Sequence, residues 1–271
     1  MAESVALWKM YFWVYNFIMK KGKPGSEFWQ SAKRADKSAL PKSTTGKLIV
    51  IDGIDGSGKS TQTGLLVKHL KKDGRKVKVV DFPDYYSNFF GKFIGHCLSE
   101  QYYKFIHVHP KIASVLYAAD RFESKGKIEK WLKEGNIVVA NRYISSNQIH
   151  QGGKIANVKK REDFIKWLDE MEYKIFKIPK PDFVFYLNVP TKFVLNLIKN
   201  RNKNGKRSYL ENKKDVHEKD VNFLKNSNKS ALWLAKTQKN WIKIDCVKNE
   251  VLSTREDIHK EIYEKIKKII N

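Results

Sequence analysis

The residues with the clearest chemistry lie between Leu48 and Thr61, in the sequence LIVIDGIDGSGKST. Gly53 begins the spacing G-x-x-x-x-G-K-[ST], which ends at Lys59 and Ser60. Glycines let a backbone curl so that several N–H groups face one phosphate, and a helix N-terminus adds partial positive charge. We therefore predict a triphosphate-binding loop in which Lys59 contacts the β- and γ-phosphates and Ser60 offers its hydroxyl to Mg²⁺. The predicted nucleotide-binding residues are Gly53, Ile54, Asp55, Gly56, Ser57, Gly58, Lys59, Ser60 and Thr61.

A strand and a helix flank this loop in the predicted structure. Leu48–Ile51 is a run of four apolar residues and predicts a buried strand. After the loop, Leu65, Leu66 and Leu70 recur with helical spacing. An ordinary Gly-rich turn between a strand and a helix is the alternative interpretation. Strand, loop, Lys-Ser pair and helix all stand in the register that a phosphate-binding loop requires, so we favour phosphate binding.

Four more apolar runs predict strands, and helical patterns separate them. The runs are Val77–Phe82, Ile137–Ala140, Phe183–Val189 and Trp241–Cys246. Because most of the runs are continuous rather than alternating, we predict a parallel sheet with helices on both faces, an α/β fold. Ligands of such sheets bind at the carboxyl ends of the strands, so the residues that follow each strand form the candidate site.

Three segments between the strands bear on this site. Pro110 opens a helix that carries Tyr117 and Arg121. Ser145–Val158 is polar, contains a Gly-Gly pair, and is predicted to be a functional loop. Val216–Lys239 is predicted to be a long helix.

Charged residues gather in the segments that should meet at the carboxyl end of the sheet. Arg142 follows the third predicted strand, and a cationic stretch runs from Arg201 to Arg207. Tyr117 and Arg121 would join them from the helix that Pro110 opens. Two arginines, an aromatic ring and a cationic segment suit a phosphorylated acceptor and a transferring phosphoryl group.

From about Lys47 to its end, the chain resembles the thymidylate kinases (dTMP kinases), a family of P-loop nucleoside monophosphate kinases. Seven segments carry the resemblance in the family's order: IDGIDGSGKSTQ, FPDY, LYAADR, NRY, SSNQIHQGG, PKPDFVFYLNVP and KDVHEKD. The loop alone is shared with many unrelated nucleotide hydrolases, whereas the seven segments together are specific. The resemblance implies a three-layer P-loop kinase fold, with a five-stranded parallel sheet and helices on both faces, for residues 47–271.

The resemblance also implies roles for individual residues around the acceptor. Asp55 would lie near the deoxyribose 3′-hydroxyl. Tyr117 would stack on thymine, and Arg121 would contact the base. Arg142 corresponds to the arginine of the family's DR[YFH] motif and would hold the acceptor phosphate.

Four more residues receive roles from the same resemblance. Gln148 and Gln151 lie in the segment that lines the acceptor pocket. Lys206 and Arg207 lie in the segment that resembles the lid over ATP. One of these two cations would join Lys59 and Arg142 as a catalytic group, and the choice between them stays open.

Three residues depart from the family's pattern. Asn141 stands where an aspartate usually follows the third strand and helps to hold Mg²⁺ through water. Asp52, Asp84 or the phosphates themselves could take over that task. Tyr85 replaces an arginine that touches the acceptor phosphate in many relatives, and Asn188 replaces a common aspartate.

The implied reaction is ATP + dTMP → ADP + dTDP, a step of dTTP biosynthesis that uses Mg²⁺. A kinase of another nucleoside monophosphate or of a deoxynucleoside on the same fold is the first alternative. A P-loop protein that binds nucleic acid and a catalytically weakened relative are the others. Members of the family commonly form homodimers, although nothing in the apolar helices proves one here.

Composition narrows the setting of the protein. The net charge of +24 suits anionic partners, but the lysines are scattered along all 271 residues, so we expect nucleotides rather than nucleic acid as partners. The two cysteines, Cys97 and Cys246, have no metal or redox spacing and are too few for a disulfide framework. We therefore expect a cytoplasmic protein.

Residues 1–46 form a separate extension and linker in this prediction. Val5–Met19 is rich in aromatic residues and is followed by lysines, but it is too short for a transmembrane helix. A helix that packs on protein is our preferred interpretation. An interfacial membrane anchor with basic flanks is the alternative.

Overall fold

The computed structural model describes residues 46–99, 105–204 and 220–270. The predicted extension up to residue 45 and the predicted lid residues Lys206 and Arg207 lie outside these ranges. The predictions for them therefore stay untested.

A five-stranded parallel sheet forms the centre of the fold, and the strand order is β2-β3-β1-β4-β5. The strands are β1 (Lys47–Asp52), β2 (Val77–Asp81), β3 (Ile137–Asn141), β4 (Phe183–Asn188) and β5 (Trp241–Asp245). All five predicted strands are confirmed, with ends that differ by at most one residue. β1 is the central strand, and Leu48 to Ile51 are fully buried, as a strand covered on both faces requires.

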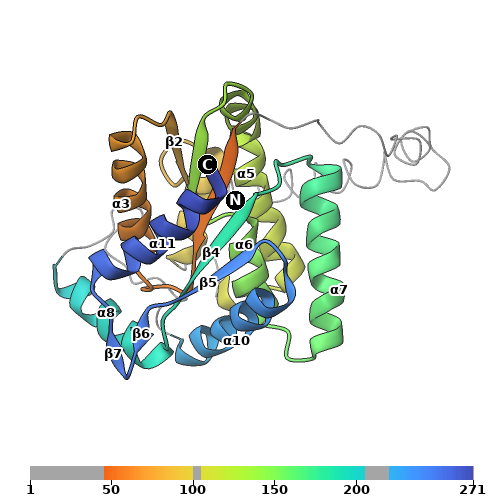
Figure 1. Cartoon of the computed structure of the whole chain (residues 1–271). Helices are drawn as coiled ribbons and strands as arrows, with labels where there is room; N and C mark the ends of the chain where they lie inside the picture. Colours follow the sequence, from red (N-terminus) through yellow and green to blue (C-terminus); the bar gives the residue numbers. More distant parts are fainter. Residues whose placement is uncertain (1–45, 100–104, 205–219, 271) are drawn as a thin grey trace, which may run out of the picture. The chain divides into compact units, whose positions relative to one another are not determined.

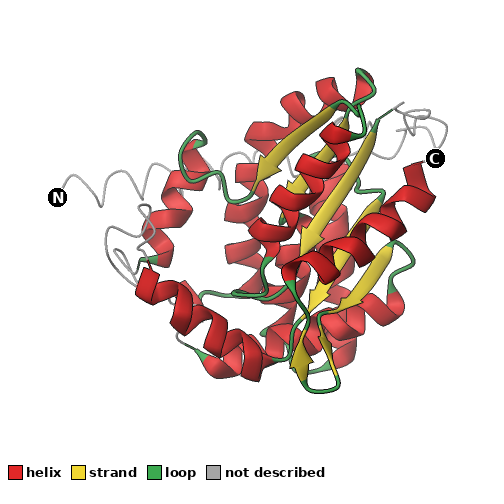
Figure 2. Cartoon of the chain, turned by 60° about the vertical axis from the view of Figure 1, so that its left-hand side comes forward, coloured by secondary structure: helices red, strands yellow, loops and turns green. Residues whose placement is uncertain are grey.

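Helices cover both faces of this sheet, as the sequence predicts. In Figure 1, α11 passes in front of the strands and α5 runs behind them, and Figure 2 shows the strands side by side among the helices. The long helices are α3 (Lys59–Lys72), α4 (Phe89–Leu98), α5 (Pro110–Lys133), α7 (Val158–Asp169), α8 (Thr191–Asn204), α10 (Val221–Thr237) and α11 (Arg255–Ile270). α10 starts at Val221, and residues 216–219 of the predicted helix are outside the described ranges.

The prediction of a loop over Ser145–Val158 is wrong, because most of this segment is helical. It contains part of the short helix α6 (Ile144–Ser146) and the π-helical turn η2 (Asn147–Gln151). Every residue of η2 is buried. Ser230 of α10 donates a hydrogen bond to the carbonyl oxygen of Gln148 at 3.0 Å. The polar residues of this segment indicated a functional loop, but contacts with α10 bury the residues of η2 in the interior.

A small hairpin after β5 was also not predicted. Its strands are β6 (Val247–Lys248) and β7 (Val251–Leu252), which pair antiparallel. Asn249 and Glu250 between them both have positive φ, as tight hairpin turns require. In the described part of the chain, no helix combines the length and the apolar character needed to cross a membrane.

Candidate active site

The phosphate loop joins β1 to α3 with the local geometry that its glycines permit. Gly56 and Gly58 have φ of +83° and +87°, a backbone region that favours glycine. Gly58 is the N-cap of α3 and accepts a hydrogen bond from the Gln62 N–H at 3.0 Å. A β-carbon on Gly56 would also lie 2.6 Å from the side chain of Ile198, so the loop packs closely on α8. The loop therefore presents backbone N–H groups at a helix N-terminus, where anions bind.

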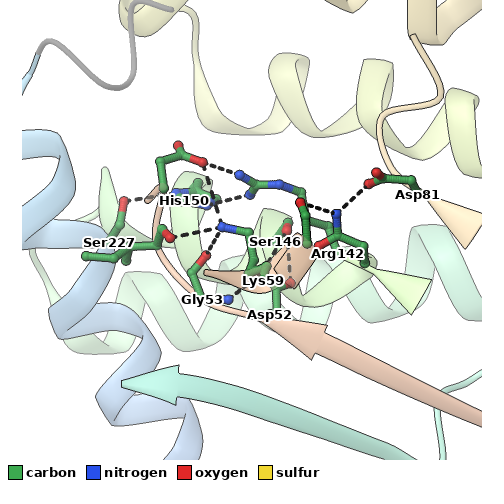
Figure 3. A network of polar contacts seen from close by, with 12 residues as sticks. Asp52, Gly53, Lys59, Asp81, Arg142, Ser146, His150 and Ser227 are labelled. Atoms are coloured by element: carbon green, nitrogen blue, oxygen red, sulfur yellow. Dashed lines mark hydrogen bonds and ion pairs between the residues drawn. The ribbon is translucent and has the colours of Figure 1, made fainter. Parts of the chain in front are cut away.

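Lys59 lies inside the curve of this loop and is 6% exposed. Its ammonium donates to the carbonyl oxygens of Gly53 and Ile54, both at 2.9 Å, and lies 3.9 Å from Asp55 Oδ1. Figure 3 shows the ammonium directed toward Gly53. A bound triphosphate would compete with these carbonyl oxygens for the ammonium of Lys59, which already faces the inside of the loop. The buried hydroxyl of Ser57 has no partner in the described part of the chain.

Arg142 meets the phosphate loop from the end of β3. Its guanidinium forms an ion pair with Asp55, which lies 87 residues earlier in the chain. Burial alone would lower the pKa of Arg142, but the carboxylates of Asp55 and Asp52 raise it above its ordinary value. Arg142 therefore carries a fixed positive charge opposite the loop.

His150 of η2 contacts the same guanidinium. Its Nε2 lies 3.2 Å from Arg142 Nη1, and its Nδ1 lies 3.2 Å from Ser227 Oγ on α10. A guanidinium can only donate, so Nε2 accepts and the proton of the neutral ring is on Nδ1. The ring also stacks on Phe223, with centroids 5.7 Å apart. Figure 3 shows this chain of contacts from α10 to Arg142.

Asp52, at the end of β1, holds the backbone around the site rather than facing the cavity. It is fully buried and accepts hydrogen bonds from the Ser145 hydroxyl at 2.5 Å and from the Ser146 hydroxyl at 2.9 and 3.1 Å. It also accepts from the Gly53 N–H at 2.8 Å. These contacts tie the phosphate loop to α6.

The predicted base-contacting residues lie on one face of α5. Tyr117 and Arg121 are four residues apart, so their side chains project from the same side of the helix. The buried guanidinium of Arg121 donates to both oxygens of Glu172, at 2.8 and 2.6 Å. Asn147 donates to the same carboxylate at 3.1 Å. Glu172 therefore fixes the orientation of Arg121 at the wall of the site.

A single cavity of about 660 Å³ unites most of these residues. Its size lies within the range of typical small-molecule sites. The predicted residues that line it are Asp55, Gly56, Ser57, Gly58, Lys59, Ser60, Thr61, Tyr117, Arg121, Arg142 and Gln151. Gln148 is not among the lining residues, because its amide turns away and donates to Asp169 at 3.3 Å.

The oxygen atoms beside Ser60 fit a magnesium ion. Ser60 is exposed in the first turn of α3, and the amide of Asn141 donates to its Oγ at 3.1 Å. The same amide donates to Asp81 at 2.8 Å. Hydroxyl and carboxylate oxygens are ligands that Mg²⁺ accepts, either directly or through its water shell.

Comparison with known proteins identifies the family to which this chain belongs. The family model described as thymidylate kinase matches residues 51–262. The chain belongs to the thymidylate kinase family. Members of this family transfer a phosphoryl group from ATP to dTMP, and the resemblance seen in the sequence is thereby confirmed.

Individual thymidylate kinases match along most of the chain. Thymidylate kinase from Plasmodium falciparum is 31% identical over 226 residues, which cover 83% of this chain and 91% of that protein. Thymidylate kinase from Caldicellulosiruptor saccharolyticus is 34% identical over 83% of this chain and 96% of its own length. The solved structure of thymidylate kinase from Candida albicans has a TM-score of 0.63 at 22% identity, covering 82% of this chain and 92% of that one. The last likeness confirms the P-loop kinase fold.

Three residues at this candidate site were not singled out from the sequence. Glu172, which holds Arg121, lies in a helical segment where an acidic residue gives no signal of its own. His150, which contacts Arg142, lies in the polar segment Ser145–Val158, where the sequence gives no signal for this particular residue. Asp81 is the last residue of β2, and the strand-end rule would have found it had the predicted strand not continued through Phe82.

Proposed function

We propose that this chain transfers the γ-phosphoryl group of ATP to dTMP, and that the 660 Å³ cavity is the site of transfer. The observation that carries the proposal is the ion pair of Asp55 with Arg142, which joins the phosphate loop to the acceptor side of one cavity. A donor held by the loop and an acceptor phosphate held by Arg142 would face each other there.

The chain's own residues would act by alignment and by neutralising charge. Loop N–H groups and Lys59 bind the donor phosphates, and Arg142 binds the acceptor phosphate. A phosphate oxygen of dTMP is already nucleophilic, so no side chain needs to remove a proton. When bound with ATP, Mg²⁺ supplies further positive charge at the β- and γ-phosphates, and Ser60 would hold it.

Base and sugar recognition would come from the other wall. Tyr117 offers an aromatic face to a pyrimidine, and Arg121 is oriented beside it by Glu172. Asp55 would accept a hydrogen bond from the 3′-hydroxyl while it pairs with Arg142. Outside the described ranges, Lys206 or Arg207 would complete the charge around the transferring group.

Phosphoryl transfer across a panel of nucleotides tests the proposal. The full chain with ATP and Mg²⁺ should phosphorylate dTMP in preference to dUMP, UMP, CMP and AMP. Lys59→Ala should lower turnover at least ~100-fold, because it removes a donor to the transferring group. Lys68→Ala, an exposed lysine of the same helix, is the matched control and should keep wild-type turnover.

Some outcomes would contradict this function. Preference for a purine monophosphate would refute the acceptor assignment, and undiminished turnover of the folded Lys59→Ala variant would refute the loop's role. Absence of any monophosphate kinase activity, with DNA or RNA affinity that falls steeply with salt, would favour a nucleic-acid-binding protein.

The homodimer and the cytoplasmic location also belong to this proposal. Light scattering on the purified full chain measures the first, and fluorescence of a tagged full chain in cells locates the second. A monomer at micromolar concentration, or association of the tagged chain with membranes, would contradict them.

A further inference from the structure

Two asparagine–aspartate pairs cross neighbouring strands at the carboxyl end of the sheet. Asn141 of β3 donates to Asp81 of β2 at 2.8 Å, and Asn188 of β4 donates to Asp245 of β5 at 2.7 Å. Both pairs are in register, so each residue lies directly beside its partner. Only the first pair lines the cavity. The Asn141–Asp81 pair is therefore a candidate for a role in the site, and the Asn188–Asp245 pair outside the cavity can serve as a control.

The amide nitrogen of Asn141 connects Asp81 to the phosphate loop. It donates to Asp81 Oδ1 and also to Ser60 Oγ at 3.1 Å. A carboxylate only accepts, so the nitrogen rather than the oxygen of the amide must face Asp81. The amide oxygen is buried and has no partner in the described part of the chain. Asn141 is therefore positioned through its nitrogen, which keeps the carboxylate of Asp81 next to the serine hydroxyl.

The other carboxylates around the phosphate loop already bind protein groups. Asp52 is fully buried and accepts from two serine hydroxyls and a backbone N–H. Asp55 forms an ion pair with Arg142. Asp84 accepts from the Ser87 N–H at 3.0 Å and does not line the cavity. Asp81, in contrast, lines the cavity and has an exposed side chain beside Ser60.

We propose that Asp81 supplies the carboxylate for the water shell of nucleotide-bound Mg²⁺ in this chain, with Asn141 positioning it beside Ser60. This inference rests on the nucleotide site of the proposed function. Mg²⁺ keeps several of its waters in proteins and is usually held by one or two carboxylates together with phosphates. The amide of Asn141 is uncharged, so the negative charge is on Asp81, which is paired with Asn141 on the neighbouring strand β2.

Binding of a fluorescent ATP analogue, mant-ATP, tests this assignment without catalysis. The measured quantity is the ratio of the dissociation constant in EDTA to that in Mg²⁺. Asp81→Asn should lower this ratio at least ~5-fold relative to wild type, since the metal then loses its protein carboxylate. The double variant Asp81→Asn with Asn141→Asp moves the charge back across the pair and should restore the ratio to within ~2-fold.

The second pair provides the matched control. Asp245→Asn removes a carboxylate from the same kind of cross-strand pair outside the cavity, so its ratio should equal that of wild type. Asp81→Ser is a second carboxylate-free variant, to be measured if Asp81→Asn does not fold. An unchanged ratio in the Asp81 variant, an equal fall in Asp245→Asn, or no recovery in the double variant would overturn the proposal. The experiment contains no dTMP, so failure of the acceptor assignment would leave its result intact.

Discussion

At the scale of single residues, Arg142 combines an unusual backbone conformation with a side chain that is held beside the phosphate loop. Its φ of +65° lies in the left-handed region, which is uncommon for a residue other than glycine. This conformation follows directly after β3, and the Arg142 N–H still donates to the Ile51 carbonyl at 3.0 Å. The side chain then contacts Asp55 and His150 together. Such strain often persists where the surroundings hold a functional group in place.

Substitution of Arg142 should change the KM for the acceptor dTMP much more than the KM for the donor ATP. In Arg142→Ala, we expect the KM for dTMP to rise ~10- to 100-fold, because a charged hydrogen-bond donor to phosphate contributes roughly 1.5–3 kcal/mol. The KM for ATP should change less than ~3-fold. Steady-state kinetics with each substrate varied in turn measures both constants.

Arg75→Ala is a suitable control for the loss of one positive charge. Arg75 is exposed in the turn after α3 and does not line the cavity. Its removal should leave both KM values unchanged. A rise in the KM for ATP alone in Arg142→Ala would show that Arg142 serves the donor instead.

At the scale of elements, α4 and α5 hold the segment that follows β2 against the site. Asp120 of α5 accepts from the Asp84 N–H at 3.1 Å and from the Asn88 amide at 2.8 Å. Gly91 of α4 lies so close to this segment that a β-carbon there would stand 1.9 Å from the Asp84 carbonyl oxygen. Tyr85 of the same segment lines the cavity. Close packing of α4 therefore sets one wall of the site.

Two glycine-to-alanine substitutions should have opposite effects on stability. Gly91→Ala should lower the free energy of unfolding by roughly 1–3 kcal/mol, because the new methyl group collides with backbone atoms. Gly64→Ala in α3 should raise it by roughly 0.5–1 kcal/mol, since its methyl group meets no atom within 4 Å and alanine favours helix. Urea unfolding curves measure both. Equal shifts for the two variants would contradict the close approach of α4.

At the scale of the whole molecule, Asp120 links stability to pH. It is 1% exposed, and burial raises the pKa of its carboxyl from 3.8 to about 6, although the Asn88 amide and the Asp84 N–H lower it in part. Between the two pKa values the folded chain binds more protons than the unfolded chain. Stability therefore falls as pH rises from about 4 to about 6, by on the order of 3 kcal/mol for this group.

Asp120→Asn should remove this contribution, because an amide does not titrate in that range. Urea unfolding of wild type and variant at several pH values from 4 to 7 gives a difference curve. We expect the wild type to lose stability relative to the variant as pH rises through the window. Other carboxyl groups with a raised pKa, such as that of Asp169, contribute equally to the stability of both proteins, so their contributions cancel in the difference curve. A flat difference curve would show that Asp120 is ionised throughout.

Local sequence predicted the strands well and the helical segment after β3 poorly. Apolar runs such as Leu48–Ile51 are continuous because both faces of a parallel strand are buried. In η2, the polar Asn147, Gln148 and His150 are also buried, since partners on α5, α7, α10 and η3 (Glu170–Ile175) bond to them. Those partners are distant in sequence, so no local sequence pattern predicts the contacts with them.

The sequence by itself determined the phosphate loop, the alternation of strands and helices, and the family. These features depend on neighbouring residues: glycines that permit positive φ, and apolar runs that must be covered. The tertiary structure decided which charges meet. Arg142 pairs with Asp55 over 87 residues, and Asp81 stands beside Asn141 because β2 and β3 are adjacent and in register. Strand order and register are set by packing of the whole sheet, so only the folded chain places a carboxylate next to Ser60.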